Sequence, residues 1–257
     1  MILFISIPAL NFHHPAFDPY RNEIIHLTLA YRLPDLALLN ALATARGLVN
    51  ARKLPLHFTT PERHLLARDY EQHILQTGCI PTRPDNWHDV MNALVWLRFP
   101  QFKAALNAAH AEAIMTEIGP LRGRRRDALT MLDESGVWVV SENAALPDLL
   151  RQREWQTLFW TQRAAVIAQM QFVIVGHALL EKVLQPYPSI TGKCLLLDAD
   201  ADWNSLEVRA SRALAAIEAP DQLAPLPLMG IPGWDTHNAH AAYYANPAVF
   251  RPPRKTG

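Results

Sequence analysis

The chain has 257 residues, of which 50% are hydrophobic and 19% are charged. This composition excludes an intrinsically disordered protein, because disordered chains are poor in hydrophobic residues. Its 24 lysines and arginines balance its 24 aspartates and glutamates, so no net charge attracts nucleic acid or an anionic membrane. We therefore expect no nucleic-acid partner and no membrane partner, and any anion site must be local.

The cysteines and the apolar segments predict a cytoplasmic protein. Cys79 and Cys194 are too few and too far apart to form a disulfide framework or a metal knuckle. The most apolar stretch, residues 164–180, contains two glutamines and a histidine and is too short to span a membrane. Residues 1–10 lack the basic region with which a signal peptide begins. We expect a cytoplasmic location and no disulfide.

Four helices are expected in the first 120 residues. A capping residue or a proline precedes each predicted helix, and glycine or proline follows most of them, which is the usual asymmetry of helix ends. The predicted helices cover about 35–47, 60–78, 87–98 and 100–118.

Short apolar runs with β-branched residues replace the helical pattern after residue 120. The runs 128–132 and 137–140 flank Asp133-Glu134-Ser135-Gly136, whose composition predicts a β-hairpin with a glycine-bearing turn. Further along we expect strands over 169–175 and 193–197, helices over 177–181 and from Asp202 or Asn204 to about 219, and a proline-rich tail from Pro220 lying on the surface of the core.

This order of elements favours the α+β class. Helices followed by strands predict a helical N-terminal half packed on a small, mostly antiparallel or mixed sheet. We expect a single domain over 1–257, with a helix-rich part to about residue 120, a mixed part over 121–219 and the tail over 220–257.

Polar side chains share one stripe on each of two consecutive predicted helices. The stripes comprise His88 and Asn92 on the first helix, and Lys103, Asn107 and His110 on the second. Since helices joined by a short turn commonly pack antiparallel, the two stripes could face one pocket. His88 is then a candidate catalytic base, and the other four are candidate substrate-binding residues. The alternative is that these groups are solvated or bonded to the neighbouring backbone.

The dipeptide His88-Asp89 is similar to the pair found in metal-dependent phosphohydrolases. Those enzymes need further ligands from other helices, whereas the carboxylates Asp133 and Glu134 fall in the predicted hairpin. The sequence contains no HExxH, Cys-x-x-Cys or EF-hand spacing. We therefore assign no metal ligand from the sequence and leave the cofactors open.

An arginine-rich segment, residues 122–126, precedes Asp127. Arginine binds carboxylate or phosphate through two parallel hydrogen bonds, so the segment is a candidate anion site. Arg126 is the candidate substrate-binding arginine, and Asp127 is a candidate catalytic carboxylate. The alternative is a solvated segment whose arginines pair with Asp133 or Glu134.

His177 and Glu181 stand one helical turn apart, directly after a predicted strand and Gly176. Ligands often bind where a strand leads into the start of a helix, because free backbone N–H groups point outward there. The carboxylate could orient the imidazole for general acid–base catalysis, which makes both residues catalytic candidates. A structural hydrogen bond between helix and sheet is the alternative.

Several of these segments together resemble the uncharacterised bacterial family catalogued as domain of unknown function 3025. The resemblance runs from about residue 80 to 251 and implies kinship without a mechanism. It rests on Asn86-Trp87-His88-Asp89, Phe99-Pro100, Arg126-Asp127, Gly176-His177-Ala-Leu-Leu-Glu181, Pro225-Leu-Pro227 and Gly230-Ile-Pro-Gly-Trp234, among others.

Two functional hypotheses follow from these residues. The first is a hydrolase or transferase acting on a small anionic substrate, with His88 or His177 as the base and Arg126 or Lys103 holding the anion. The second is a non-catalytic cytoplasmic binding or assembly protein whose polar clusters are structural. Convergence of the candidate residues on one cavity favours the first hypothesis. The oligomeric state stays open.

Overall fold

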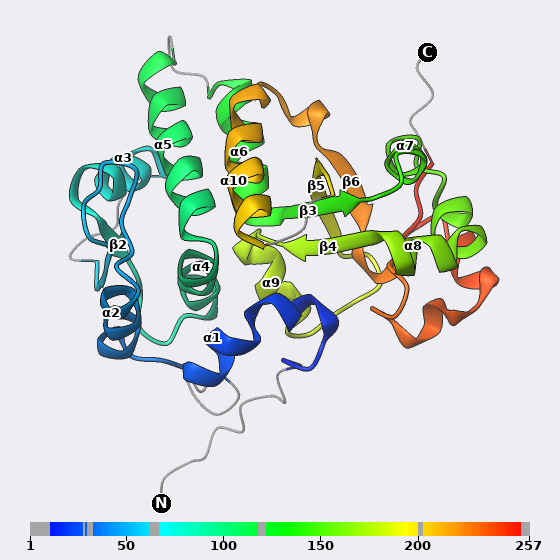
Figure 1. Ribbon diagram of the computed structural model, residues 1–257, viewed down its shortest axis with the longest axis horizontal. Helices are drawn as coiled ribbons and strands as arrows, with labels where there is room; N and C mark the ends of the chain where they lie inside the picture. The colour runs from blue at the N-terminus through cyan, green and yellow to red at the C-terminus, as the bar shows by residue number, and fades with distance from the viewer. Residues whose placement is uncertain are drawn as a thin grey trace, which may run out of the picture.

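A helical half and a sheet half lie side by side in the structure (Figure 1). The N-terminal helices gather on one side, and the strands with the C-terminal segments occupy the other. This arrangement confirms the predicted α+β class. The computed structural model describes residues 11–27, 29, 33–61, 67–117, 122–199 and 203–252.

The N-terminal helices begin where capping residues predict. The Asp35 carboxylate accepts a hydrogen bond from the Leu38 N–H, and the Asn86 side chain accepts one from the Asp89 N–H. The predicted start of the second helix falls partly outside the described residues. The elements of this half are η1 (Pro15–Tyr20), α1 (Arg21–His26), α2 (Leu36–Ala45), β1 (His57–Thr59), α3 (Ala67–Thr77), β2 (Cys79–Pro81), α4 (Trp87–Arg98) and α5 (Pro100–Thr116).

A four-stranded mixed sheet, in the order β4-β3-β5-β6, forms the other half. The strand β3 is antiparallel to β4 and parallel to β5, and β5 is antiparallel to β6. The mixed sheet agrees with the predicted fold, and β1 and β2 form a separate parallel pair. The strands are β3 (Gly136–Ser141), β4 (Met170–Ile174), β5 (Thr191–Asp198) and β6 (Ala224–Pro227).

The predicted hairpin was wrong. Residues 124–135 form a helix, α6 (Arg124–Ser135), and β3 begins at Gly136. Ala128, Leu129 and Leu132 are fully buried, and their spacing places them on one face of a helix. The antiparallel partner of β3 is β4, which follows it in the chain, and not the predicted run 128–132, which precedes it. Asp133 and Glu134 therefore belong to the last turn of a helix.

The tail contributes to the sheet as well as to the surface. It contains β6, and it buries Leu226 and Leu228. The prediction that it lies over the surface was therefore wrong for this strand. The remaining elements are α7 (Ala145–Arg151), η2 (Thr157–Thr161), α8 (Arg163–Gln169), α9 (His177–Val183), α10 (Trp203–Ala213), η3 (Leu214–Ala216), η4 (Pro220–Gln222), η5 (Leu228–Gly230), η6 (Thr236–Ala239) and η7 (Ala241–Ala245).

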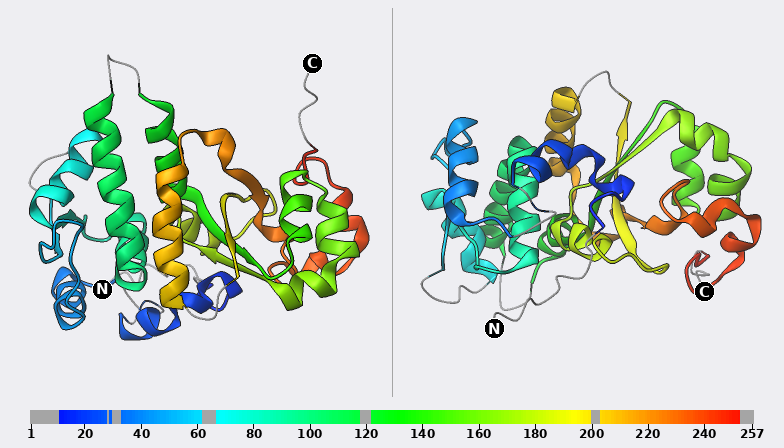
Figure 2. Two further views of the ribbon diagram at one scale, coloured as in Figure 1. Left: turned by 45° about the horizontal axis from the view of Figure 1, so that its top comes forward. Right: turned by 90° about the horizontal axis from the view of Figure 1, so that it is seen from below.

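Aromatic side chains join the two halves. Helices α6 and α10 both pack against α5, and in Figure 2 they lie between α5 and the strands of the larger sheet. The ring centroid of Trp138 on β3 lies 4.7 Å from that of Phe99 and 5.0 Å from that of Phe102, and all three side chains are fully buried. Each such ring pair adds about 0.5–1.5 kcal/mol to the stability beyond the burial of area. The helices that carry the candidate residues are thus held rigidly against the sheet.

Gly176 brings the start of α9 against the end of α6. A Cβ atom at this position would lie 2.3 Å from the backbone nitrogen of Gly136, so only glycine fits. The Gly176 N–H donates a hydrogen bond to the Gly136 carbonyl at 2.9 Å. This close approach places His177, the next residue, beside the carboxylates of Asp133 and Glu134.

Within the described residues, the structure contains no helix whose length and apolar character would let it cross a membrane. The thiols of Cys79 and Cys194 are both free, and Cys194 is buried.

Candidate functional site

A cavity of about 360 Å³ collects ionisable side chains from several helices. Its walls come from α3, α4, α5 and α6, together with the first residue of α9. Three histidines line it: His88, His110 and His177. Residues far apart in the sequence therefore meet at one place, as catalytic or ligand-binding sites require.

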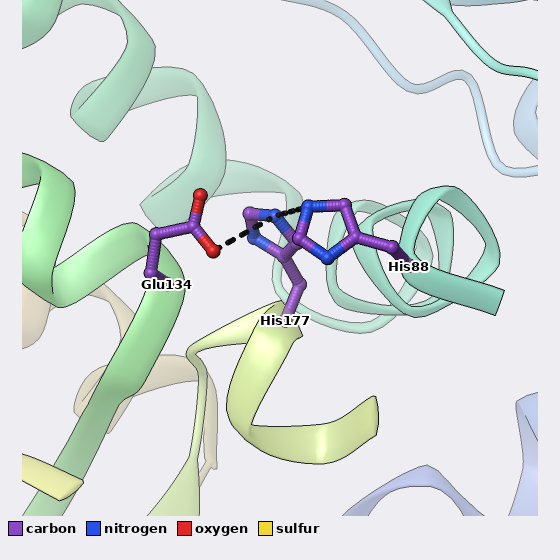
Figure 3. A group of neighbouring side chains, drawn as sticks. All are labelled: His88, Glu134 and His177. Atoms are coloured by element: carbon purple, nitrogen blue, oxygen red, sulfur yellow. Dashed lines mark hydrogen bonds and ion pairs between the residues drawn. The ribbon is translucent and has the colours of Figure 1, made fainter. Parts of the chain in front are cut away.

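The imidazoles of His88 and His177 face each other at the cavity wall (Figure 3). His88 is the second residue of α4, and His177 is the first residue of α9. Their Nε2 atoms lie 3.0 Å apart, and their rings meet edge to face with centroids 4.4 Å apart. His177 is buried, whereas a third of the His88 side chain is exposed. The pair thus joins the core to the open part of the cavity.

Each imidazole has a carboxylate beside its other ring nitrogen. Glu181 Oε2 lies 3.1 Å from His88 Nδ1, and Asp133 Oδ2 lies 3.6 Å from His177 Nδ1. The expected pairing of Glu181 with His177 was wrong, because Glu181 reaches across to α4. An acceptor beside Nδ1 favours the tautomer that carries its proton there.

A buried ion pair supports the His177 side of the site. The Lys103 ammonium donates a hydrogen bond to Asp133, and both side chains are almost completely shielded from solvent. Burial by itself would raise the pKa of Asp133, but the charges of Lys103, His177 and His110 hold that pKa well below its usual range. Asp133 therefore stays anionic behind the histidine pair.

Glu134 places a third carboxylate beside the imidazole pair, on the Nε2 side of His177. Its Oε2 lies 3.7 Å from His177 Nε2, and 40% of its side chain is exposed. Partial burial raises the pKa of Glu134, and the charge of Asp133 raises it further. The carboxylate therefore lacks full charge compensation in this position.

A second polar network lies on the α3 side of the cavity. The Asn92 amide donates to the Tyr70 hydroxyl at 3.0 Å, and the Asn107 amide donates to Glu71 Oε2 at 2.7 Å. Burial raises the pKa of Glu71 to about 7, with Asp133 contributing in the same direction. The network joins α4 and α5 to α3.

His110 completes the buried part of the lining. Its Nε2 has no hydrogen-bond partner within the described parts of the chain. Burial lowers its pKa to about 4, so the imidazole is neutral at pH 7.

Arginines form the cationic part of the lining. Arg126 Nη1 lies 3.2 Å from Glu117 Oε2, and Arg122 Nε lies 2.6 Å from Asp127 Oδ1. Arg83 binds the Asp89 carboxylate through two nitrogens. Each guanidinium has five N–H donors, so one carboxylate partner leaves donors for a second anion.

The structure places the sequence-predicted residues in three groups. His88, Asn92, His110, Arg126 and His177 line the cavity. Lys103, Asn107 and Glu181 hold residues that line it. Asp127 is not in the lining and forms an ion pair with Arg122, with 44% of its side chain exposed.

The sequence reasoning missed Asp133 and Glu134. Both had been assigned to a turn, although the burial-prone residues 128, 129 and 132 carry a helical spacing that extends to them. The suggested pairing of the arginines with these two carboxylates was also wrong. Arg124 and Arg125 instead pair with Asp221 and Glu218, respectively.

A larger groove of about 750 Å³ lies between η1 and β4. Its charged lining residues include Arg21, whose guanidinium is bound to Asp18, and Glu23, which is bound to Arg46. No imidazole or thiol belongs to its lining among the residues described. The smaller cavity is the better candidate because its groups can transfer protons or bind ions.

His88, Glu134 and His177 have the composition of a metal site. One donor atom from each lies within 4.8 Å of the other two. Two imidazoles and one carboxylate form a ligand set found for zinc and for other divalent transition metals. The expectation of no metal ligand rested on the absence of a known metal-binding spacing and on the turn predicted at Asp133 and Glu134, which the helix α6 replaces.

The comparison with known proteins identifies one relationship. A family model described as "Protein of unknown function (DUF3025)" matches residues 56–254. No curated protein and no solved structure matches the chain. The matched range includes every described residue of the cavity.

Proposed function

Because this chain belongs to the DUF3025 family, whose description assigns no function, we propose a function from its cavity: a hydrolase or transferase acting on a small anionic substrate. The convergence of His88, His177 and Glu134 on a cavity that also contains Arg122 and Arg126 carries this proposal.

The arginine side of the cavity would hold the anion. Arg126 comes from the first turn of α6, and only 13% of its side chain is exposed, so part of its hydration is already removed. A guanidinium in such a setting binds a phosphate or carboxylate group more strongly than one in open water. The chain has no net charge, so this local charge would select the substrate.

The imidazole side would activate the attacking group. Burial lowers the pKa of His177 to about 4, so this ring is neutral at pH 7 and keeps a lone pair. A nitrogen lone pair can take a proton from water or bind a cation that acidifies water. Either action turns water into a nucleophile beside the bound anion.

One observation favours the non-catalytic alternative. The Lys103–Asp133 and Asn107–Glu71 contacts join α5 to α6 and α3, as structural polar groups do. Lys103 and Asn107 themselves do not line the cavity, however, whereas His88 and Glu134 line it and are partly exposed. We therefore prefer the enzyme.

The test is a hydrolysis screen of the purified chain with aryl phosphates, phosphodiesters and carboxylate-bearing esters. His177→Ala should lower the rate on an accepted substrate by about 10²–10⁴-fold. Arg126→Met should weaken substrate binding. Arg124→Met is the matched control, because Arg124 pairs with Asp221 in an exposed position outside the cavity. Turnover that survives His177→Ala unchanged, or no turnover in the whole screen, would contradict the proposal.

The same proposal includes a cytoplasmic setting without nucleic-acid or membrane partners. Free thiols at Cys79 and Cys194 and the balanced charge of the chain support it. Fractionation of cells that express the native chain measures it. Recovery of the chain in the membrane pellet after a salt wash would contradict the proposed cytoplasmic location.

A further inference from the structure

We propose that His88, His177 and Glu134 together bind one divalent transition-metal ion, of which zinc is the representative, at the wall of the cavity. The inference deepens the proposed function, because a metal there would be its reactive centre. The evidence for the metal site is the geometry of its ligands, and metal binding can be measured without a substrate.

The three ligand residues come from three helices, one of which packs against the other two. His88 lies on α4, Glu134 on α6 and His177 on α9, and α9 contacts both α4 and α6. In Figure 3, dashed lines join the Glu134 carboxylate to His177 and His177 to His88, and the three donor atoms lie within 4.8 Å of one another. A site assembled from rigid helices holds its ligands in place before the ion arrives.

The protonation of the two rings makes the point between them electron-rich. Glu181 beside His88 Nδ1 and Asp133 beside His177 Nδ1 favour a proton on each Nδ1 atom. Both Nε2 atoms then carry lone pairs, yet they lie only 3.0 Å apart. Two facing lone pairs repel each other unless a cation stands between them.

A shared proton explains this distance less well. If His177 Nε2 donated a proton to His88 Nε2, the lone pair of His177 Nδ1 would face the Asp133 carboxylate. If His88 donated, the lone pair of its Nδ1 would face Glu181 at 3.1 Å.

The separations of the ligands suit a small divalent ion. Zinc bonds of about 2.0–2.1 Å at tetrahedral angles place two ligand atoms about 3.3–3.4 Å apart. The Nε2–Nε2 distance is 3.0 Å, and the distance from His177 Nε2 to Glu134 Oε2 is 3.7 Å. Both values lie within a few tenths of an ångström of the tetrahedral one, and all three donor atoms lie within 4.8 Å of one another.

The surroundings of the site also match those of a metal centre. Metal-binding histidines usually donate their second N–H to a carboxylate, as Glu181 and Asp133 allow here. Three protein ligands leave a fourth position open, and the exposure of His88 and Glu134 directs it to the cavity. Water bound there would have its pKa lowered to about 7 and could be the nucleophile.

The experiment measures metal binding directly. The full chain, freed of any affinity tag and of metal by EDTA and dialysis, is titrated with ZnCl₂ by calorimetry at about pH 8, where an ordinary histidine is neutral. Titration with CoCl₂ gives a visible spectrum that reports the coordination. We expect one equivalent of either ion to bind.

Ligand variants separate this site from adventitious binding. Loss of the carboxylate that holds a metal-binding histidine costs about 10–100-fold in metal affinity, so Glu181→Ala should weaken zinc binding within this range. Glu134→Gln and His177→Gln remove a ligand itself, so each should weaken zinc binding by more. His237→Gln and Glu112→Gln are the controls, because these side chains are exposed and distant in the chain from the ligands. Circular dichroism checks that each variant is folded, and Glu134→Gln keeps the shape of a partly exposed side chain.

Two results would overturn the metal site: no binding by the folded wild-type chain, or equal affinity in Glu134→Gln, His177→Gln and the controls. Its failure differs from failure of the proposed function. Turnover that EDTA leaves unchanged would refute the metal and keep the enzyme. Stoichiometric zinc binding without turnover in the substrate screen would keep the metal and refute the hydrolase or transferase.

Discussion

Two clusters of buried polar groups in this molecule satisfy their hydrogen bonds in different ways. One lies around Asn238 in the C-terminal segment. The Asn238 amide donates to the Met229 and Ile231 carbonyls at 2.9 and 2.7 Å, and its side-chain oxygen accepts from Arg163. The Tyr244 hydroxyl donates to the Asn238 carbonyl. The cluster uses the hydrogen-bonding capacity of its central residue and holds η5, η6 and η7 together.

The other cluster lines the cavity, and several of its atoms have no partner. His110 Nε2, Asn92 Oδ1 and Asn107 Oδ1 are buried without a hydrogen bond from any described residue. An unpaired buried polar atom costs about 1–3 kcal/mol, so structural clusters rarely keep one. The contrast indicates that the Asn238 cluster stabilises the fold, whereas the polar atoms of the cavity remain available to bind a ligand.

The largest loss of stability is expected for Lys103, which forms a buried ion pair with Asp133 behind the histidines. Lys103→Met leaves the Asp133 carboxylate buried without its ammonium partner, and loss of one partner of a buried ion pair costs about 3–5 kcal/mol. Urea denaturation measures the change. Arg151→Met is the control, because its pair with Asp148 is exposed and contributes about 0–1 kcal/mol. Equal losses in the two variants would contradict the assignment of a buried pair.

Two asparagines test the comparison directly. Asn238→Ala deprives two carbonyls and Arg163 of their partner and should cost about 1–3 kcal/mol. Asn92→Ala removes one hydrogen bond, to Tyr70 at the open cavity, and should cost about 1 kcal/mol or less. Only Asn92→Ala should change substrate binding. If Asn92→Ala were the more destabilising of the two, the cavity would be a structural cluster.

The pH dependence of stability gives a third test, carried out in EDTA. Burial lowers the pKa of His110 to about 4 in the folded state, whereas the unfolded value is about 6.5. Between these values the unfolded chain holds a proton that the folded chain lacks. The His110 contribution therefore falls as the pH drops from 6.5 to 4, by at most about 1.4 kcal/mol per pH unit.

Glu71 has the opposite effect on the stability. Its pKa is raised to about 7 in the folded state, so its contribution to the stability grows as the pH falls from 7 to the pKa of Glu71 in the unfolded chain. The difference between the wild type and His110→Gln isolates the histidine, because Glu71 is present in both. Chemical denaturation at several pH values should show a shallower loss on the acid side for the variant. His237→Gln, exposed, should follow the wild type. Parallel curves for wild type and His110→Gln would show that His110 titrates normally.

Local signals predicted the elements that position half of the site. The bounds of α4 follow from Asn86, which caps it, and from Phe99-Pro100, where the backbone cannot continue the helix. The strand β4 followed by Gly176 and a helix was also predicted from residue types alone. These features depend on neighbours in the chain, so the positions of His88 and His177 on helix starts were accessible from the sequence.

The other half of the site depends on tertiary contacts. Asp133-Glu134-Ser135-Gly136 has the composition of a turn, but burial of Leu129 and Leu132 extends α6 through Ser135. The spacing of His177 and Glu181 predicts neighbours on one helix, whereas packing of α9 against α4 brings Glu181 to His88. Such pairings between helices could not be predicted, since no local pattern encodes them.

The smallest effect on stability is expected for His88, although it is a proposed ligand of the site. His14, a buried histidine outside the cavity, gives the comparison. His14 is buried, its Nε2 lies 2.9 Å from the Trp234 carbonyl oxygen, and its Nδ1 accepts a hydrogen bond from the Ala16 N–H. His14→Ala should cost about 1–3 kcal/mol, because a buried carbonyl and an N–H lose their partners. His88→Ala should stay within about 0.5 kcal/mol of the wild type, because its side chain is partly exposed and its pair with Glu181 is open to solvent.

Zinc should reverse the order of these two variants. At a zinc concentration 100 times the dissociation constant, a chain with an intact site gains about 2.7 kcal/mol of stability. His14→Ala keeps all three ligand residues and should show the full gain, whereas His88→Ala should show little. Thermal unfolding with EDTA and with zinc measures both effects on the same samples. An equal gain in the two variants would mean that zinc binds outside the histidine pair. A loss of stability in metal-free His88→Ala as large as in His14→Ala would mean that His88, like Asn238, serves the fold.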